Sequence, residues 1–282
     1  LDIAGYYRSK FDVKVVGVTG SVGKTTTKDM IALVVAQKYK TLKTQGNHNN
    51  EIGMPQTLFG LDSSYEAAVI EMGMSHQGEI SRMSMSCQPD VAVITNIGIS
   101  HIENLGTQEN ILKAKLEILD GAAYDAPLIL CRDDKLLAGV QLHSDRKVYY
   151  YSVSKKDCDV YASGVKTVDN SITFTINYEG GKIAAQINCL GEHNVKNALA
   201  AFCVGLALDI PPEDIVKGIA QFKPEGLRQN VTVIDGVTYI VDCYNAAPDS
   251  MKASLSVLSQ AQAEGKRICV LGDMLELGKN SK

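Results

Sequence analysis

The sequence predicts an α/β protein whose core is a mostly parallel sheet with a phosphate-binding loop, and three observations lead to this prediction. The apolar run at 13–18 passes through the glycine-rich turn TGSVGKTT into a helical pattern that begins near residue 24. Apolar runs typical of buried strands then alternate with helical patterns as far as residue 152. Residues 158–190 change to the alternating pattern of short strands, which indicates a small antiparallel part of the sheet.

Length and composition limit the kinds of protein that this can be. The 282 residues suffice for one large domain or two ordinary ones with a well-buried core. A hydrophobic fraction of 45% and a charged fraction of 21% are typical of a soluble globular protein. The net charge of −4 gives no electrostatic reason to expect nucleic acid or an anionic membrane as partner. No apolar run reaches the roughly 20 residues of a transmembrane helix, so we expect no membrane insertion.

The seven cysteines are scattered along the chain and show no C-x-x-C spacing. Several lie in apolar runs such as AFCVG and RICVLG. This pattern favours reduced core residues over disulfides or a metal site. We therefore expect a cytoplasmic protein.

The stretch 17–29, GVTGSVGKTTTKD, has the features of a phosphate-binding loop. Gly20 and Gly23 allow the backbone to curl so that its N–H groups point at anionic oxygens, next to the positive end of the new helix. Lys24 would reach the β- and γ-phosphates, and the Thr25 hydroxyl would ligate Mg²⁺. The commonest form of the motif has a glycine where Val18 stands, but the flanking strand and helix favour a nucleoside triphosphate site over a chance turn. The candidate residues are Thr19, Gly20, Ser21, Gly23, Lys24, Thr25 and Thr26.

The next part of the chain continues the α/β pattern and adds a carboxylate. A helix at 24–38 and a strand near 40–44 are followed by the loop QGNHNNEIG at 45–53. The polar residues of this loop either only form turns or orient a polar substrate. The apolar strand at 66–72 ends near Glu71. Chemistry gathers at the carboxyl ends of parallel strands, so Glu71 is a candidate ligand for the Mg²⁺ that Thr25 would touch; otherwise it is a capping or surface residue.

A strand at 90–95 leads into the loop NIGISHIENLG at 96–106. His101 in this loop is expected at the same end of the sheet as Glu71. An isolated histidine is more often structural than functional, but the shared sheet edge favours a functional role here.

The helix expected at 107–121 contains a lysine on its apolar side. At 100° per residue, Lys115 projects between Ile118 and Leu119, whereas Lys113 lies on the polar side. A buried ammonium is costly, so Lys115 either reaches out to solvent, has an anionic partner, or has a lowered pKa and reacts as an amine. One such reaction is carbamylation by CO₂, which turns the cation into a carboxylate that can ligate Mg²⁺.

Residues 127–222 contain further strands and helices. A strand at 127–131, a helix at 133–142 and a strand at 147–153 are followed by the antiparallel part. An apolar helix at 191–209 carries Asn194 and Asn197 one turn apart, where their amides either read an adenine edge or cap the helix. A second helix is expected at 211–222.

The composition changes to that of a linker at 223–226, where we expect a domain boundary. A hairpin around Asp235-Gly236, a helix to about residue 263 and a strand at 267–273 would complete one βαβ unit. One such unit is small for a domain, and the chain begins with Leu1 instead of methionine. The sequence therefore reads as a piece of a longer protein, with a linker at 1–12, a central domain at 13–223 and a partial second domain at 224–282.

Several stretches together resemble the Mur ligase family of ATP-dependent amide-forming enzymes of bacterial cell-wall synthesis. They are TGSVGKTT, IEMG, TNIGISHIENLG, the AK of ILKAKLEIL, GEHNVKNALAA, DCYNAAPDSM and GDMLELG, in the order that the family has. They extend over nearly the whole chain. The resemblance implies a P-loop ATPase domain, here without the preceding UDP-binding domain, followed by the start of a Rossmann-like domain.

The resemblance also implies roles for individual residues. Lys24 and Thr25 would bind phosphates and Mg²⁺, Glu71 would ligate the first Mg²⁺, and His101 with a carbamylated Lys115 would serve the second. Asn194 and Asn197 would lie near adenine; Arg228 and Asp242 would contact the nucleotide, and Asn245 would lie where the last domain closes over the phosphates. Leu116 departs from the family, which has a glycine after the Ala-Lys pair.

Within the family, NHNNEIGMPQTLF, IEMGMSHQGEI and DCYNAAPDSM look most like members that add D-alanyl-D-alanine to UDP-N-acetylmuramoyl-tripeptide through an acyl phosphate. Such an enzyme would act as a cytoplasmic monomer, and the present chain alone is expected to be inactive. The alternatives are another amino-acid ligase of the Mur type, a ligase similar to folylpolyglutamate synthase, a P-loop ATPase switch, or a non-catalytic ATP-binding module.

Overall fold

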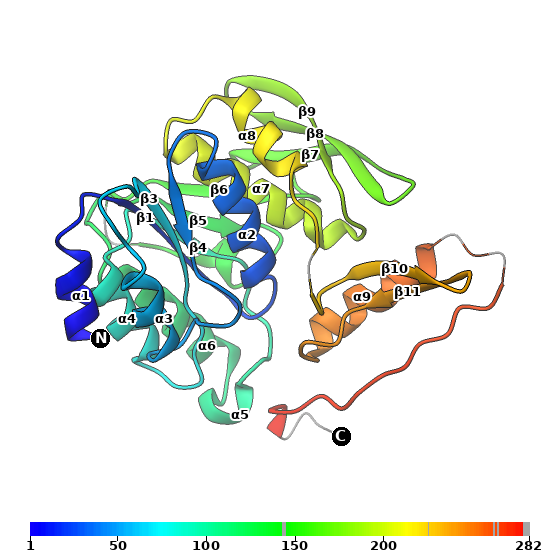
Figure 1. Cartoon of the computed structure of the whole chain (residues 1–282), viewed down its shortest axis with the longest axis horizontal. Helices are drawn as coiled ribbons and strands as arrows, with labels where there is room; N and C mark the ends of the chain where they lie inside the picture. The colour runs from blue at the N-terminus through cyan, green and yellow to red at the C-terminus, as the bar shows by residue number, and fades with distance from the viewer. Residues whose placement is uncertain (143–144, 225, 262, 264, 279–282) are drawn as a thin grey trace.

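The computed structural model describes residues 1–142, 145–224, 226–261, 263 and 265–278. Among these residues, nine strands form one sheet in the order β2-β3-β1-β4-β5-β6-β7-β8-β9 (Figure 1). The strands are β1 (Lys14–Thr19), β2 (Thr41–Lys43), β3 (Ala67–Glu71), β4 (Val91–Ile94), β5 (Leu128–Cys131), β6 (Val148–Ser152), β7 (Val160–Val168), β8 (Ser171–Tyr178) and β9 (Gly181–Ile187). The predicted α/β class with a mostly parallel sheet is confirmed.

The predicted antiparallel part is confirmed, and it is continuous with the parallel sheet. In the order of the sheet, neighbouring strands from β2 through β1 to β7 pair in parallel. Strand β8 runs antiparallel to both β7 and β9. The join is short, because β6 and β7 pair only through Tyr151 with Val160 and Ser152 with Tyr161. One hydrogen-bonded sheet therefore extends from the phosphate-binding loop to the hairpin.

Helices α2 (Lys24–Val35), α7 (Glu192–Ala207) and α8 (Pro212–Ala220) pack against one another on one side of this sheet (Figure 1). A second group, α1 (Asp2–Arg8), α3 (Gly53–Leu58), α4 (Glu79–Cys87) and α6 (Gln108–Leu116), packs on the other side. Strands β3 and β4 are buried throughout, as expected of parallel strands that helices cover on both faces. The segment expected as a linker at 1–12 contains α1, whose Arg8 side chain donates to the Cys87 and Val13 carbonyls.

The predicted helix at 133–142 is wrong. Only a 3₁₀ turn, Leu137–Gly139, forms there. Asp134 explains the difference, because its Oδ1 accepts from the Leu136 and Leu137 amides and its Oδ2 from the Ile97 amide. A short carboxylate that takes up its own downstream amides favours a turn over a helix.

Two other predicted boundaries, both between β4 and β5, also change. The helix expected at 107–121 ends at Leu116 and continues as a 3₁₀ turn, Glu117–Leu119. The loop at 96–106 contains a short helix, α5 (Ile102–Leu105), which begins directly after His101.

The hairpin expected at Asp235-Gly236 is confirmed by β10 (Asn230–Ile234) and β11 (Val237–Val241), which α9 (Pro248–Gln260) follows. The strand expected at 267–273 is wrong, because this segment is extended but unpaired, and Val270 is 96% exposed. A β-strand requires a neighbour for its backbone groups, and no described strand lies beside this one. The expected linker at 223–226 includes residue 225, and the expected helix end near 263 adjoins residues 262 and 264; these three lie outside the described residues.

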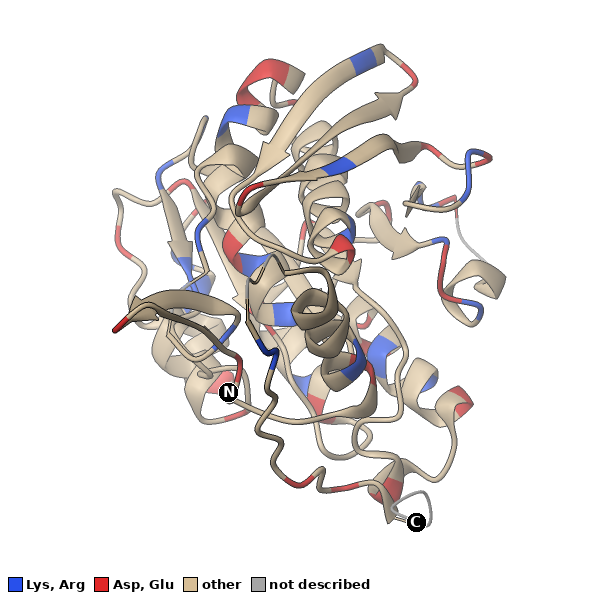
Figure 2. Ribbon diagram, turned by 90° about the vertical axis from the view of Figure 1, so that its right-hand side faces the viewer, with Lys and Arg blue, Asp and Glu red and all other residues tan. Residues whose placement is uncertain are grey.

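All seven cysteines are free, and Cys87, Cys131, Cys189 and Cys203 are buried. The expectation of a core position is wrong for Cys243 and Cys269, which are exposed, and Cys158 is only half-buried. Figure 2 shows Lys and Arg interspersed with Asp and Glu along the ribbon, without a long stretch of one sign. Within the described residues, none of the helices combines the length and the apolar character needed to cross a membrane.

Candidate functional site

Two adjoining cavities lie where β1, β3 and β4 end. The larger cavity has a volume of about 960 Å³ and extends from the phosphate-binding loop to the first turn of α7 and to α9. The smaller cavity has a volume of about 540 Å³ and lies on the other side of the loop, beside β3 and α6. Gly23, Thr25, Arg228 and Asp242 line both cavities. This is the carboxyl edge of the parallel sheet, where the sequence predicts the site.

The phosphate-binding loop is held in place by β4. Gly20 has a φ of +148°, and a Cβ there would lie 1.9 Å from the Thr95 Oγ1, so glycine is required. Asn96 Oδ1 accepts from the Val22 amide at 2.9 Å and from the Ser21 amide at 3.1 Å. Gly23 adopts a φ of 80° directly before α2 begins at Lys24. The predicted strand, glycine turn and helix are therefore all present.

Lys24 lies half-buried beneath this loop. Its Nζ donates to the Gly20 carbonyl at 2.9 Å and to the Ser21 carbonyl at 3.2 Å. Burial lowers the pKa of Lys24, the nearby Glu71 carboxylate opposes this effect, and Arg228 adds to it. Thr19 and Ser21 are buried beside Lys24, while Thr26 lines the larger cavity.

Glu71 ends β3 with its carboxylate in the smaller cavity. Its Oε1 accepts from the Asn49 side-chain amide at 2.7 Å and from the Thr25 hydroxyl at 3.3 Å. Its Oε2 is buried and has no hydrogen-bond partner among the described residues. A buried carboxylate oxygen without a partner is costly, so this atom suits a bound cation.

Lys115 and His101 line the same cavity. Lys115 is 2% exposed, so it does not reach out to solvent, and no hydrogen bond or ion pair links it to another described residue. Burial, together with Lys24, holds the pKa of Lys115 well below its usual value. His101 has a φ of 63°, and its Nδ1 lies 2.6 Å from the Glu276 Oε2.

The pKa of His101 is lowered chiefly by burial, and the cations of Lys24 and Lys115 add to this effect while Glu276 opposes it. No group of three or more His, Cys, Asp or Glu side chains suited to a metal occurs in the described part of the chain. The oxygen ligands at this site are instead the Glu71 carboxylate and the Thr25 hydroxyl, which suit a hard cation such as Mg²⁺.

Asn194 and Asn197 lie on the first turns of α7, in the wall of the larger cavity. Neither caps the helix, whose N-cap is Gly191. Asn197 Oδ1 accepts from the Thr27 hydroxyl at 3.1 Å, and its amide donates to the Asn194 Oδ1 at 3.0 Å. Both amides are thereby fixed in orientation beside the phosphate-binding loop.

Arg228, Asp242 and Asn245 come from the chain around the β10–β11 hairpin and face the two cavities. The Arg228 guanidinium lies over the Tyr244 ring, 4.1 Å from its centroid. Asp242 Oδ2 accepts from the Ser254 hydroxyl of α9. Every residue that the sequence suggested for this site therefore lies on one of the two cavities or in the loop between them.

Sequence reasoning missed three residues. Asn49 belongs to a loop that the sequence left undecided between a turn and a substrate site, and it contacts Glu71 directly. Asn96, which orients the phosphate-binding loop, directly follows the strand expected at 90–95, and that position could have drawn attention to it. The contact of Glu276 with His101 joins segments far apart in the sequence, so no local pattern predicts it.

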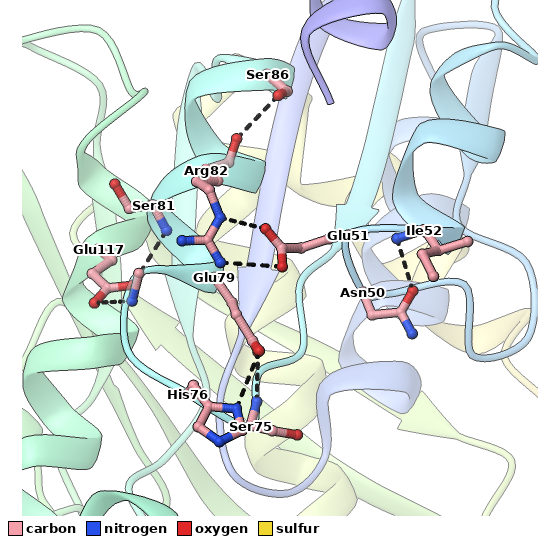
Figure 3. A network of polar contacts seen from close by, with 11 residues as sticks. Asn50, Glu51, Ile52, Ser75, His76, Glu79, Ser81, Arg82, Ser86 and Glu117 are labelled. Carbon is pink, nitrogen blue, oxygen red and sulfur yellow. Dashed lines mark hydrogen bonds and ion pairs between the residues drawn. The ribbon is translucent and has the colours of Figure 1, made fainter.

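Figure 3 shows how the rim of the smaller cavity is held together. Arg82 of α4 donates through Nη2 to the Glu51 Oε2 at 3.1 Å, which ties α4 to the loop at 45–53. Glu117, which follows α6, accepts from the Gly78 amide at 2.8 Å. The first turn of α4 thus joins the loops after β2 and β3 to the end of α6.

Comparison with known proteins identifies relatives over nearly the whole chain. Residues 18–205 match the family model of the Mur ligase middle domain, and residues 227–282 match that of the Mur ligase glutamate ligase domain. The UDP-N-acetylmuramoyl-tripeptide–D-alanyl-D-alanine ligase of Bacillus subtilis is 43% identical over 98% of this chain and 59% of its own length. The same ligase of Escherichia coli is 34% identical over 100% of this chain and 62% of its own length.

Solved structures give the same result. MurF from Acinetobacter baumannii superposes with a TM-score of 0.93 at 36% identity, over 99% of this chain and 61% of that one. MurF from Thermotoga maritima in complex with ADP has a TM-score of 0.88 at 29% identity, over 99% and 64% of the two chains. The present chain thus spans about three fifths of the length of these relatives.

Proposed function

Because this chain belongs to the Mur ligase family, we propose that the whole protein is an ATP-dependent ligase of bacterial peptidoglycan synthesis that adds D-alanyl-D-alanine to UDP-N-acetylmuramoyl-tripeptide. The ligases from Bacillus subtilis and Escherichia coli, with 43% and 34% identity, support this choice within the family. The observation that carries the proposal is the smaller cavity, in which Lys24, Glu71 and Lys115 meet beside the phosphate-binding loop.

ATP would bind across the two cavities. The triphosphate would lie on the loop at 19–26 and against Lys24, whose present contacts with loop carbonyls would give way to phosphate oxygens. The adenine would lie in the larger cavity near Asn194 and Asn197. The ADP complex of the Thermotoga maritima relative supports a nucleotide at this kind of site.

The chain's residues fit two magnesium ions. Thr25 and Glu71 would hold the first, because the Glu71 Oε2 is buried without a partner among the described residues. His101 and a carbamylated Lys115 would hold the second. Bound magnesium would neutralise the charge that develops on the phosphoryl oxygens.

Lys115 has the properties that carbamylation requires. A lowered pKa provides the neutral amine, which attacks the carbon of CO₂, loses a proton and becomes a carbamate anion. The burial of Lys115, without a hydrogen bond or ion pair to another described residue, makes an uncharged or anionic form preferable to an isolated cation. The carbamate would add a carboxylate to the cavity that Lys24 and Arg228 also line.

In the proposed reaction, the γ-phosphoryl group of ATP passes to the tripeptide carboxylate and gives ADP and an acyl phosphate. The amine of D-alanyl-D-alanine then attacks the acyl carbon, an amide forms, phosphate leaves and the amine gives up a proton. Phosphoryl transfer depends on alignment and charge neutralisation, which Lys24 and the loop amides supply from the chain itself. We find no need for a nucleophilic side chain.

We divide the chain into a central ATPase domain at 13–223 and part of a C-terminal Rossmann-like domain at 224–282, with a linker at 1–12. Arg228, Asp242 and Asn245 line the cavities from the second part and would close over the nucleotide, which would exclude water from the acyl phosphate. The four buried free cysteines suit a reducing compartment, so we assign the protein to the cytoplasm, as a monomer that acts on small molecules.

The experiment that tests this proposal measures phosphate release by the full-length protein with MgATP and UDP-N-acetylmuramoyl-tripeptide. Release that requires D-alanyl-D-alanine would establish the reaction. Release that ignores the dipeptide but responds to another amino acid would keep the ligase mechanism and change the substrate. Phosphate release that no acceptor stimulates would contradict the proposal and favour an ATPase switch.

A further inference from the structure

We propose that Lys28 is a positioning residue that fixes Glu71 for metal binding, an inference that rests on the proposed role of Glu71. Lys28 lies on α2, one turn after Thr25, and is only 2% exposed. It lies beyond the loop at 19–26 on which the triphosphate would lie, and it lines the larger cavity from α2. A buried ammonium is costly to keep, and a methionine of similar length would pack there without that cost.

The contacts of Lys28 lead to the end of β2. Its Nζ donates to the Thr44 carbonyl at 2.8 Å and lies 3.1 Å from the Asp29 Oδ1. Thr44 is fully buried, and its amide donates to the Val69 carbonyl of β3. The ammonium of Lys28 therefore fixes the residue at which the chain leaves β2.

Thr44 in turn holds Glu71. The Glu71 amide donates to the Thr44 Oγ1 at 3.0 Å, while its carboxylate Oε1 accepts from Thr25. Helix α2 therefore holds Glu71 at both ends, at the carboxylate through Thr25 and at the backbone through Lys28 and Thr44. The remaining oxygen, Oε2, is left without a partner among the described residues.

The same arrangement fixes the second partner of the carboxylate. The loop that starts at Thr44 returns to β3, where the Asn49 carbonyl accepts from the Gly73 amide at 2.7 Å and the Asn49 side chain donates to Glu71. If Thr44 shifts, both the amide of Glu71 and the origin of this loop shift with it. Lys28 thus affects Glu71 in two ways, through the hydrogen bond of its amide to Thr44 and through the position of Asn49.

The test is the affinity of the 282-residue chain for Mn²⁺, used in place of Mg²⁺ with a non-hydrolysable ATP analogue and measured from the free-ion EPR signal. Lys28→Met should weaken Mn²⁺ binding roughly ten- to hundredfold, as loss of the groups that orient metal ligands does. Lys28→Arg, which keeps a cation and donors, should lie between this variant and the wild type. Affinity for the analogue without metal should not change.

A second readout needs no metal. Because the Glu71 amide loses a fixed acceptor, Lys28→Met should increase deuterium exchange at Glu71 and over the loop at 45–53. Lys43→Met is the matched control, since the Lys43 ammonium contacts the same Asp29 at 2.7 Å, but the side chain is 36% exposed and does not donate to the Thr44 carbonyl. Lys43→Met should leave the exchange at Glu71 and the affinity for Mn²⁺ as they are.

Wild-type Mn²⁺ affinity and wild-type exchange in a folded Lys28→Met variant would overturn the inference. So would a fall in metal-free analogue binding, which would make Lys28 a direct phosphate ligand. If Lys28→Met does not fold, Thr44→Val and Thr44→Ser replace it, because only the serine keeps the hydroxyl that accepts from the Glu71 amide. Equal Mn²⁺ affinities and equal deuterium exchange in these two variants would overturn the inference. If Glu71→Gln binds Mn²⁺ as the wild type does, the proposed metal site is wrong, and deuterium exchange still tests Lys28.

Discussion

The half-buried Lys24 and the buried Lys115 line one cavity, and each has a lowered pKa. Burial lowers the pKa of both lysines; Glu71 partly offsets this effect at Lys24, whereas the cation of Lys24 adds to it at Lys115. The two ammonium groups repel each other in the free protein, and a polyanionic phosphate bound beside them would relieve this repulsion. The two lysines therefore respond differently to substitution.

Substitution of Lys24 should remove charge neutralisation at the phosphates. We expect Lys24→Ala to lower substrate-dependent phosphate release by the full-length protein at least about a hundredfold, as loss of one oriented donor does in other enzymes. Lys38→Ala is the control, because Lys38 is exposed after the end of α2, donates to the Leu208 and Asp209 carbonyls and lines neither cavity. Activity close to that of the wild type in Lys24→Ala would refute the assignment of the loop.

Substitution of Lys115 by alanine tests the chemical role of this residue in amide formation. Lys115→Ala should abolish amide formation, and short-chain carboxylates should restore part of it by replacing the carbamate. Mass spectrometry of the CO₂-equilibrated protein should show one added carboxyl group at Lys115. An unmodified Lys115 under those conditions would contradict carbamylation.

Stability should depend on pH through the same residue. The folded pKa of Lys115 lies well below the ordinary 10.5, so between these two values the unfolded state binds more protons and stability rises with pH. In CO₂-free buffer, Lys115→Met should raise the free energy of unfolding by roughly 1–4 kcal/mol near pH 7. The gain should shrink as the pH approaches 10.5 and should be read from urea unfolding at several pH values. A constant gain would mean that Lys115 does not titrate on unfolding.

Helix α4 and the 3₁₀ turn Glu117–Leu119 approach each other closely at Gly121. A Cβ at Gly121 would lie 2.1 Å from the Ser84 carbonyl oxygen, which belongs to the backbone and cannot turn aside. Ser84 Oγ also donates to the Ile118 carbonyl at 2.6 Å and accepts from the Gly121 amide. The two segments are therefore joined by packing and by hydrogen bonds at one point.

Gly121→Ala should accordingly destabilise the fold by about 1–3 kcal/mol, as overpacking does. Gly139→Ala is the matched control, because Gly139 also lies at a 3₁₀ turn, has no positive φ and has nothing within 4 Å of its Cβ position. It should leave stability unchanged or raise it slightly. Equal denaturation midpoints for the two variants would show that α4 can move away at no cost.

At the level of elements, the sequence was informative where a pattern acts locally. The strand before Gly20 and the helix after Lys24 follow from apolar runs and a glycine turn, and Glu71 follows from the end of a buried strand. The prediction of a helix at 133–142 failed because the Asp134 carboxylate accepts hydrogen bonds from the amides of residues 136 and 137, which outweighs a weak helical pattern. The strand at 267–273 failed because pairing depends on a neighbour that no local pattern supplies.

At the level of the whole molecule, the site combines segments that are far apart in the sequence. The contacts of Asn96 with Val22, and of Glu276 with His101, form only after the chain has folded. The sequence could therefore suggest residues that line the two cavities, but not which side chains hold them in place. The order of the nine strands in the described sheet likewise depends on long-range pairing.

The chain as a whole should bind nucleotide without completing the reaction. It spans 59% of the length of the Bacillus subtilis relative, although both cavities that the proposed ATP site requires are present. We expect the 282-residue chain to bind an ATP analogue in calorimetry and to form no amide product. Robust amide formation by this chain alone would contradict this expectation.

The buried thiols offer a way to observe the molecule opening. Burial raises the pKa of Cys87 and of Cys189 to about 12, so neither reacts with an alkylating reagent while its surroundings stay closed. Cys87 ends α4, Cys131 ends β5, Cys189 follows β9 and Cys203 lies within α7. The rate at which each thiol becomes labelled thus reports, without any engineered probe, how often that part of the native protein exposes its interior to solvent.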